Sequence, residues 1–233
     1  MLISDRWLGP DIVILNPQLP LEIFLPPEDF KHRNFIGTHD PEGLNGGAFF
    51  LRVDDWSVQM LVEVMAPPRE AGFNIAEWKD AKALENVLAS EQYREAVVYQ
   101  PRMWFNAYQL DAERFEGKRG DLLVHFHDLE GDKWSAMQQT LAKLSDRKIN
   151  STWSVPLRET TYEREVLEYW DRLRKSNKLL ELAEKKLGEE QVQKARDKLS
   201  WVQDYQCDQE VAMHSAMDEM KSALGITEGE KVA

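Results

Sequence analysis

The feature that most constrains the fold is the stretch from residue 43 to residue 52, GLNGGAFFLR. Three glycines and an asparagine precede an unbroken apolar run, and this pattern predicts a tight loop that leads into a buried strand. Glycine lets the backbone approach a ligand closely, and an asparagine amide both donates and accepts hydrogen bonds. A loop of this composition can hold a polyhydroxylated ligand such as a sugar. The glycines can also be explained by the start of a strand that needs positive φ.

Length and charge limit the classes of protein that this chain can belong to. Its 233 residues, 42% of them hydrophobic, are enough for one core, or for one core with an appendage. The net charge of −12 repels phosphate backbones and anionic lipid headgroups, so we expect no nucleic-acid partner. The single cysteine, Cys207, excludes an internal disulfide and leaves the redox compartment open. Residues 1–6 contain no apolar run long enough for a signal or a membrane span.

Expected strands and helices alternate through the first two thirds of the chain. The β-favouring run at residues 12–15 is typical of a strand buried on both faces of a parallel sheet. A helix is expected to begin after Asp54 or Asp55 and to stop at Pro67, and a second one to cover residues 78–90. This alternation predicts the α/β class. The remaining expected strands are residues 35–38, 48–53, 97–99 and 122–126, and a turn is expected at residues 40–43.

The pattern becomes helical after about Thr160. One apolar stripe runs from Val166 to Gly188, where the helix should end, and a second runs from Val192 to Ala223. The two stripes predict a helical hairpin or a coiled-coil arm over residues 159–225, followed by a disordered tail at residues 226–233. Such a stripe is usually a packing face within one chain, and it also allows an oligomer to form through these helices.

Three motifs follow one another along the chain, namely DIVILNP at residues 11–17, the stretch 43–52, and GDLLVHF at residues 120–126. This order resembles the fungal and plant Golgi glycosyltransferases that include α-galactosyl-, α-mannosyl- and xyloglucan xylosyltransferases, over about Trp7 to Trp134. The resemblance implies a GT-A-like sheet that binds a nucleotide diphospho-sugar. It further implies transfer of a hexose or pentose to a glycan acceptor with retention of configuration, and Mn²⁺ as the cofactor.

The metal ligands follow from two of these motifs. Family members carry Asp-x-Asp where this chain has GPD at residues 9–11, and a histidine followed by Phe-x-Gly where it has His125. The resemblance therefore implies Asp11 and His125 as metal ligands, with one carboxylate replaced by Gly9. His127 points to the same strand face as His125, and the two could form a site of their own. Without the family, Asp11 reads as a strand-edge residue and His125 as a core histidine.

The catalytic and sugar-binding residues are implied by two further segments. Asn45, Gly46 and Gly47 match a family loop that contacts the donor sugar, and Asp80 matches an acidic position near that sugar. Asp80 and Asn45 are therefore the expected catalytic residues. Lys82 stands where several relatives carry the acid closest to the reacting sugar. It could pair with phosphate, mark lost catalysis, or belong to a solvated helix face.

A third matching segment, residues 100–108, contributes Arg102, Trp104 and Asn106 as expected substrate-binding residues. Aromatic rings beside amide and guanidinium groups suit sugar stacking and hydrogen bonding. The family's nucleotide-binding strands precede its Asp-x-Asp motif, whereas this chain has ten residues before Asp11. We therefore expect residues 1–158 to form a glycosyltransferase-like domain without its N-terminal nucleotide-binding part. A Golgi or other secretory location is implied by the family, and a cytoplasmic one if the N-terminal part is truly missing.

Two functional hypotheses follow. The first is a retaining, metal-dependent glycosyltransferase that is truncated or diverged at its N-terminus, with its activity impaired by the truncation and by the missing first Asp of the Asp-x-Asp motif. The second is a non-catalytic interaction module derived from such an enzyme.

Overall fold

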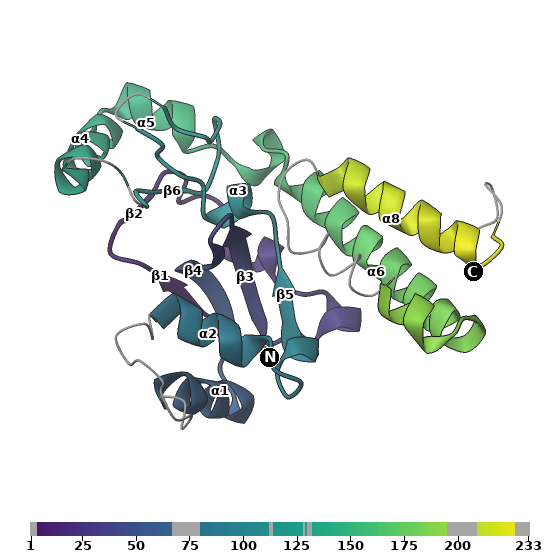
Figure 1. Ribbon diagram of the computed structural model, residues 1–233. Coiled ribbons are helices and arrows are strands. Elements are labelled where there is room, and N and C mark those ends of the chain that lie inside the picture. Colours follow the sequence, from purple (N-terminus) through teal and green to yellow (C-terminus); the bar gives the residue numbers. More distant parts are fainter. Residues whose placement is uncertain are drawn as a thin grey trace. The chain divides into compact units, whose positions relative to one another are not determined.

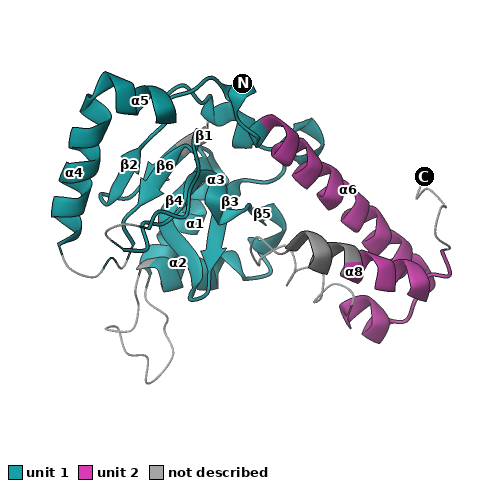
Figure 2. Cartoon of the chain, turned by 90° about the horizontal axis from the view of Figure 1, so that it is seen from above, with its two compact units in different colours: residues 1–162 teal, residues 163–233 magenta. Residues whose placement is uncertain are grey.

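The computed structural model describes residues 4–66, 80–111, 114–127, 129, 132–194 and 209–226. These residues divide into two compact units, Met1–Tyr162 and Glu163–Ala233, which Figure 2 colours separately. Within the described ranges, no helix combines the length and the apolar composition that crossing a membrane requires.

Unit 1 is a mixed α/β structure in which short strands and helices alternate (Figure 1). Its strands are β1 (Ser4–Leu8), β2 (Ile12–Ile14), β3 (Phe35–Asp40), β4 (Gly43–Arg52), β5 (Val97–Tyr99) and β6 (Leu123–His125). Its α-helices are α1 (Asp55–Met65), α2 (Asp80–Leu88), α3 (Arg102–Phe105), α4 (Lys133–Ser145) and α5 (Arg147–Trp153). Single 3₁₀ turns are η1 (Leu21–Phe24), η2 (Glu28–Phe30), η4 (Arg94–Ala96) and η5 (Leu157–Glu159).

The strands form two sheets that are largely antiparallel. The larger sheet has the order β1-β4-β3-β5, in which only β3 and β5 are parallel, and the smaller sheet pairs β2 with β6. The predicted α/β class is confirmed at this level, but the prediction of a parallel strand buried on both faces at residues 12–15 is wrong. β2 lies in a two-stranded antiparallel sheet with β6. Successive side chains of a strand point to opposite sides, and only one side of β2 is covered, so Val13 is buried while Ile14 is 47% exposed.

The glycine-rich stretch lies inside a strand and not in a loop before it. β4 already begins at Gly43, which pairs with Asp40 across a two-residue turn, so Asn45, Gly46 and Gly47 belong to the sheet. Gly43 needs its lack of a side chain because its φ is 120°. The expected turn at residues 40–43 is confirmed, and the strand extends five residues further toward the N-terminus than predicted.

Helices and aromatic side chains cover opposite faces of the larger sheet. On one face, α1 and α2 pack on the strands through a cluster that includes Met60, Leu84 and Leu88. α1 begins as predicted, because the Asp54 carboxylate accepts a hydrogen bond from the Ser57 backbone amide. α2 is described from Asp80 onward, so its predicted start at residues 78–79 lies outside the described residues. On the other face, the rings of Phe24, Phe50, Phe105 and Tyr162 contact one another.

Two long helices in the described part of unit 2 pack side by side. α6 (Tyr162–Lys186) contacts α8 (Gln209–Ala223) through a buried cluster of Leu179, Ala183, Met217 and Met220 (Figure 2). α6 ends just before Gly188, as predicted. The middle of the second predicted stripe, at residues 195–208, and the predicted tail after residue 226 lie outside the described residues. The buried cluster joins the C-terminal half of α6 to the C-terminal half of α8, so the two helices run in the same direction (Figure 1). This is not the packing of a two-helix hairpin, and the coiled-coil arm stays a prediction.

Candidate functional site

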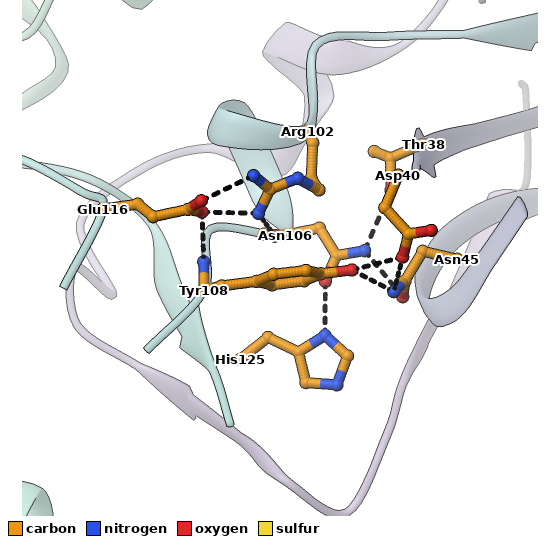
Figure 3. Close-up of polar contacts among 8 residues, drawn as sticks. All are labelled: Thr38, Asp40, Asn45, Arg102, Asn106, Tyr108, Glu116 and His125. Atoms are coloured by element: carbon orange, nitrogen blue, oxygen red, sulfur yellow. Dashed lines mark hydrogen bonds and ion pairs between the residues drawn. The ribbon is translucent and has the colours of Figure 1, made fainter. Parts of the chain in front are cut away.

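Eight polar residues from separate elements of unit 1 meet in one place, and we call them the polar cluster (Figure 3). β3 and β4 provide three of them, α3 and the segment after it provide a further three, and the last two come from residue 116 and β6. Residues 107–109 run alongside β6, because the His125 amide donates to the Ala107 carbonyl at 2.7 Å and the Gln109 amide donates to the His125 carbonyl at 2.9 Å. The members are Thr38, Asp40, Asn45, Arg102, Asn106, Tyr108, Glu116 and His125.

Asn45 lies at the centre of the polar cluster and is almost fully buried. Its Nδ2 group donates to Asp40 Oδ2 at 2.8 Å and to the Tyr108 hydroxyl. Its Oδ1 atom accepts from the Gly47 amide at 2.8 Å and from Asn106 Nδ2 at 2.9 Å. Both amide hydrogens and both lone pairs are thus engaged within the protein. The structure gives Asn45 a positioning role, and its contact with a sugar stays a prediction.

Asn106 connects Asn45 to the histidine. Its Nδ2 group donates to Thr38 Oγ1 and to Asn45 Oδ1, each at 2.9 Å. Its Oδ1 atom lies 2.7 Å from His125 Nδ1. Asn106 and Thr38 are fully buried, so water cannot replace these partners.

A hydrogen-bonded pair, Tyr108 with Asp40, and an ion pair, Arg102 with Glu116, support the other side of the polar cluster. The Tyr108 hydroxyl donates to Asp40 Oδ2 at 2.6 Å. Burial would raise the pKa of the Asp40 carboxyl, but hydrogen bonds from Asn45 and Tyr108 outweigh it and lower that pKa. Arg102 binds both oxygens of Glu116, and its guanidinium lies 3.9 Å from the centre of the Tyr108 ring. Burial, followed by the hydrogen bond to Asp40, raises the pKa of the Tyr108 hydroxyl.

Asp11 and Lys133 lie on the Nε2 side of the buried His125 ring. The Asp11 Oδ1 atom lies 3.3 Å from His125 Nε2, and Lys133 Nζ lies 3.0 Å from Asp11 Oδ2. Burial lowers the pKa of the His125 imidazole to about 4 despite the neighbouring carboxylate, so the ring is neutral at pH 7. Burial would raise the pKa of Asp11, but the hydrogen bond from Lys133 helps to lower it below its usual value. The Asp11 carboxyl is therefore ionised at neutral pH.

Two glycines allow these side chains to approach one another. A Cβ atom on Gly47 would lie 2.3 Å from His125 Cε1, which is far inside van der Waals contact. A Cβ atom on Gly9 would lie 3.1 Å from Asp11 Oδ1, and the Gly9 amide donates to the Gly47 carbonyl at 2.7 Å. Gly47 is thus required for packing against the histidine. Gly9 lies next to the Asp11 carboxylate, and the Asp-x-Asp motif would place a second carboxylate at position 9.

The structure brings together Asp11, Asn45, Asn106 and His125, four of the residues singled out from the sequence, although they come from distant parts of the chain. Their individual roles stay predictions.

The other expected site residues lie around this group. Gly46 faces α2, where a Cβ atom on it would lie 3.5 Å from the Ala81 Cβ. Asp80 is the first residue of α2, and its side chain lies outside the described part of the chain. Lys82 is exposed and pairs with Glu85 at 2.5 Å, which fits the solvated helix face among the three alternatives.

Arg102 and Trp104 are less accessible than their proposed contact with a sugar requires. Arg102 is buried and bound to Glu116, and Trp104 is buried with its ring 6.1 Å from that of Phe24. In the structure described here, both therefore support the fold around the polar cluster. The predicted sugar contacts of these two side chains stay predictions.

Sequence reasoning missed Asp40, Tyr108, Glu116 and Lys133. Tyr108 could have been found, because it stands two residues after Asn106 and would share its face in an extended segment. Asp40 was assigned only to a turn. Glu116 and Lys133 carry no local pattern that links them to the histidine.

The pair Asp11 and His125 fits one divalent cation. Two donors bound side by side at about 2.1–2.2 Å from one ion stand about 3 Å apart, and the observed separation is 3.3 Å. No set of three or more His, Cys, Asp or Glu side chains among the described residues is placed to hold a metal. Such an ion would therefore take two protein ligands here, with the rest of its coordination supplied by substrate or water.

A sequence comparison assigns the region that contains the polar cluster to a class of glycosyltransferases. Residues 24–133 match the model of the galactosyl transferase GMA12/MNN10 family. The match covers just under half of the chain. It includes the whole polar cluster and Lys133, while Asp11 lies outside it. The resemblance inferred from the sequence is thereby confirmed, and no curated protein matches the chain.

Proposed function

We propose that unit 1 binds a nucleotide sugar, with the diphosphate held at Asp11, His125 and Lys133, and transfers the sugar to a glycan acceptor. The observation that carries this proposal is the 3.3 Å approach of Asp11 Oδ1 to His125 Nε2 beside a lysine ammonium. A carboxylate, a neutral imidazole and an ammonium at one point suit a diphosphate with its counter-ion.

Mn²⁺ is the cation that we propose for this site, with Asp11 and His125 as its protein ligands. When bound, such an ion neutralises negative charge on a departing diphosphate. Lys133 provides a second positive charge at the same place, since its ammonium lies 3.0 Å from Asp11 Oδ2. Asp40 and Tyr108 keep Asn45 in position, and through it Asn106 and the histidine.

The donor and the stereochemistry rest on the family and not on the geometry. We propose transfer of a hexose or pentose with retention, and a Golgi or other secretory location. Gly46 lies against Ala81, the second residue of α2, so the start of this helix adjoins the glycine-rich strand. This placement supports Asp80 as the acidic residue near the sugar.

One observation favours the alternative of a non-catalytic interaction module. Gly9 stands where the family motif has a carboxylate, so the site offers one acidic ligand where two are expected. A module derived from the enzyme could keep the polar cluster for stability alone. The two proposals differ in whether the full chain binds Mn²⁺ and a nucleotide sugar.

Isothermal titration of the full chain separates them. The enzyme proposal expects Mn²⁺ to bind and to increase the affinity for one member of a panel of nucleotide sugars, with glycosyl transfer to a glycan acceptor. Asp11→Asn should weaken Mn²⁺ binding at least tenfold, while Glu28→Gln, which alters an exposed carboxylate, should not. If neither Mn²⁺ nor any nucleotide sugar gives a heat of binding, the interaction module is favoured.

Lys133→Gln provides a sharper readout, because its two expected effects have opposite signs. Removing the ammonium from Asp11 should increase the affinity for Mn²⁺ alone, since Lys133 and the ion compete for the same carboxylate. The same change should decrease the affinity for a nucleoside diphosphate in the presence of Mn²⁺. If the ion pair between Asp11 and Lys133 were purely structural, neither the gain in Mn²⁺ affinity nor the loss in nucleoside diphosphate affinity would be expected.

A further inference from the structure

We infer that Asn106 is a positioning residue that fixes the tautomer of His125, so that Nδ1 carries the proton and Nε2 presents a lone pair toward Asp11. The tautomer itself follows from hydrogen bonds within the protein. Only its consequence for metal binding rests on the proposed function.

The direction of the hydrogen bonds is set at Asn45 by two groups whose roles cannot change. The Gly47 backbone amide is always a donor, and it lies 2.8 Å from Asn45 Oδ1. The ionised Asp40 carboxylate is always an acceptor, and it lies 2.8 Å from Asn45 Nδ2. Reversing the Asn45 amide would place two donors together at Gly47 and two acceptors together at Asp40. Its orientation is therefore unique.

The orientation of Asn45 then determines that of Asn106. The Asn45 Oδ1 atom is an acceptor, so the atom of Asn106 that lies 2.9 Å from it must be the donor Nδ2. The same Nδ2 group donates its other hydrogen to Thr38 Oγ1. The remaining atom of the Asn106 amide, Oδ1, can only accept a hydrogen bond, and it faces His125.

The final step fixes the proton of the imidazole. Asn106 Oδ1 lies 2.7 Å from His125 Nδ1, so this nitrogen must carry a hydrogen. Asn45, Asn106 and His125 are at most 4% exposed, and a mispaired buried group in such a site is costly. The other ring nitrogen, Nε2, lies 3.3 Å from the Asp11 carboxylate oxygen, which is longer than the roughly 2.7–2.9 Å of a hydrogen bond between an imidazolium N–H group and a carboxylate, so the geometry indicates that Nε2 carries a lone pair. This lone pair faces Asp11 Oδ1 at 3.3 Å.

The consequence is that two electron donors face each other without a proton between them. A histidine beside a carboxylate would ordinarily donate an N–H hydrogen bond to it, and the pair would then be closed to a cation. Asn106 prevents this by holding the proton on the far nitrogen, as outer hydrogen bonds do for histidine ligands in metal sites. The pair remains open to a positively charged group.

Nuclear magnetic resonance on the full chain with ¹⁵N-labelled histidine tests the tautomer directly, in the absence of metal and sugar. At pH 7.5 the His125 signals, assigned by their loss in His125→Gln, should show a protonated Nδ1 and an unprotonated Nε2. A protonated Nε2 in the wild-type chain would overturn the inference. The tautomer is read from the unaltered protein, and a variant is used only to assign the His125 signals.

Variants at residue 106 test whether Asn106 sets the tautomer of His125. Asn106→Leu removes the acceptor, so the proton should move to Nε2 and hydrogen-bond with Asp11. Asn106→Asp retains an oxygen near Nδ1 and should restore the wild-type tautomer. Thr38→Val is the matched control, because it removes a buried hydrogen bond of Asn106 while Asn45 still orients the amide. An unchanged tautomer in a folded Asn106→Leu variant would contradict the assigned role.

Titration with Mn²⁺ separates this inference from the proposed function. Asn106→Leu should lower the affinity for Mn²⁺ by about 10- to 100-fold, and Thr38→Val should change it much less. A wild-type chain with the expected tautomer but no Mn²⁺ binding would refute the proposed metal site and leave the positioning role standing. Mn²⁺ binding by a chain whose Nε2 is protonated would refute the positioning role alone.

Discussion

Replacing Gly47 by alanine tests whether the close packing at His125 organises the site. The added Cβ atom would lie 2.3 Å from His125 Cε1 and 2.9 Å from both His125 Nδ1 and Asn45 Oδ1. Ordinary contact begins at 3.4 Å, so the ring has to move by about 1 Å. A movement of this size would break the 2.7 Å contact between the imidazole and Asn106.

The expected cost combines two effects. Overpacking of a buried site costs about 1–3 kcal/mol, and leaving buried amides mispaired costs about 1–3 kcal/mol more. We therefore expect Gly47→Ala to lower the free energy of unfolding by about 2–5 kcal/mol. For a unit of this size the melting temperature should fall by roughly 5–15 °C.

The neighbouring glycine provides a matched control. A Cβ atom on Gly46 would meet its nearest atom, the Ala81 Cβ, at 3.5 Å, which is ordinary contact. Gly46→Ala should therefore change the melting temperature, followed by circular dichroism, by only a few degrees. If the two variants melt together and Gly47→Ala leaves the His125 resonances unshifted, the packing argument is wrong.

Three further predictions concern charge. Gly9→Asp should increase the affinity for Mn²⁺ about tenfold by calorimetry, because the added carboxylate comes within reach of the same ion; unchanged affinity would count against a metal site. The His125 pKa of about 4 lies below the ordinary 6.5 of the unfolded chain, so the unfolded state binds the proton first as the pH falls. The free energy of unfolding should therefore fall by about 3 kcal/mol between pH 6.5 and 4. Urea unfolding of His125→Gln should not show this pH-dependent loss. Glu116→Gln leaves the buried Arg102 guanidinium without its carboxylate and should lower the free energy of unfolding by about 2–3 kcal/mol, whereas Glu28→Gln should have little effect on urea unfolding.

Local features of the fold were predictable from the sequence because they depend on neighbouring residues. The cap at Asp54, the end of α6 before Gly188 and the turn before Gly43 are each determined within a few positions of the chain. Strand pairing was not predictable in this way. The residues of β2 favour a strand, but whether it is covered on one face or two depends on β6, more than a hundred residues away.

In the candidate site, too, contacts between distant parts of the chain were not predictable from local sequence. The sequence identified Asp11, Asn45 and His125 only through family motifs, because nothing in the chain near them requires that they meet. Tyr108 and Asp40 acquire their roles from a hydrogen bond that joins an extended segment to the end of β3. Such a contact depends on the packing of the two segments, which periodicity does not reveal.

Under the proposed function, the charges around Asp11 explain how a site with one acidic ligand would serve a diphosphate. Asp11 and Lys133 carry opposite charges, and His125 is neutral, so these three groups sum to about zero at neutral pH. A second carboxylate at residue 9 would make the site negative, which favours a cation but opposes a diphosphate. With Gly9 in that position, a bound divalent ion makes the site positive and better matched to the anion. Loss of the carboxylate therefore weakens the hold on the free metal more than the hold on a metal–diphosphate pair, because the phosphate oxygens provide the missing ligands.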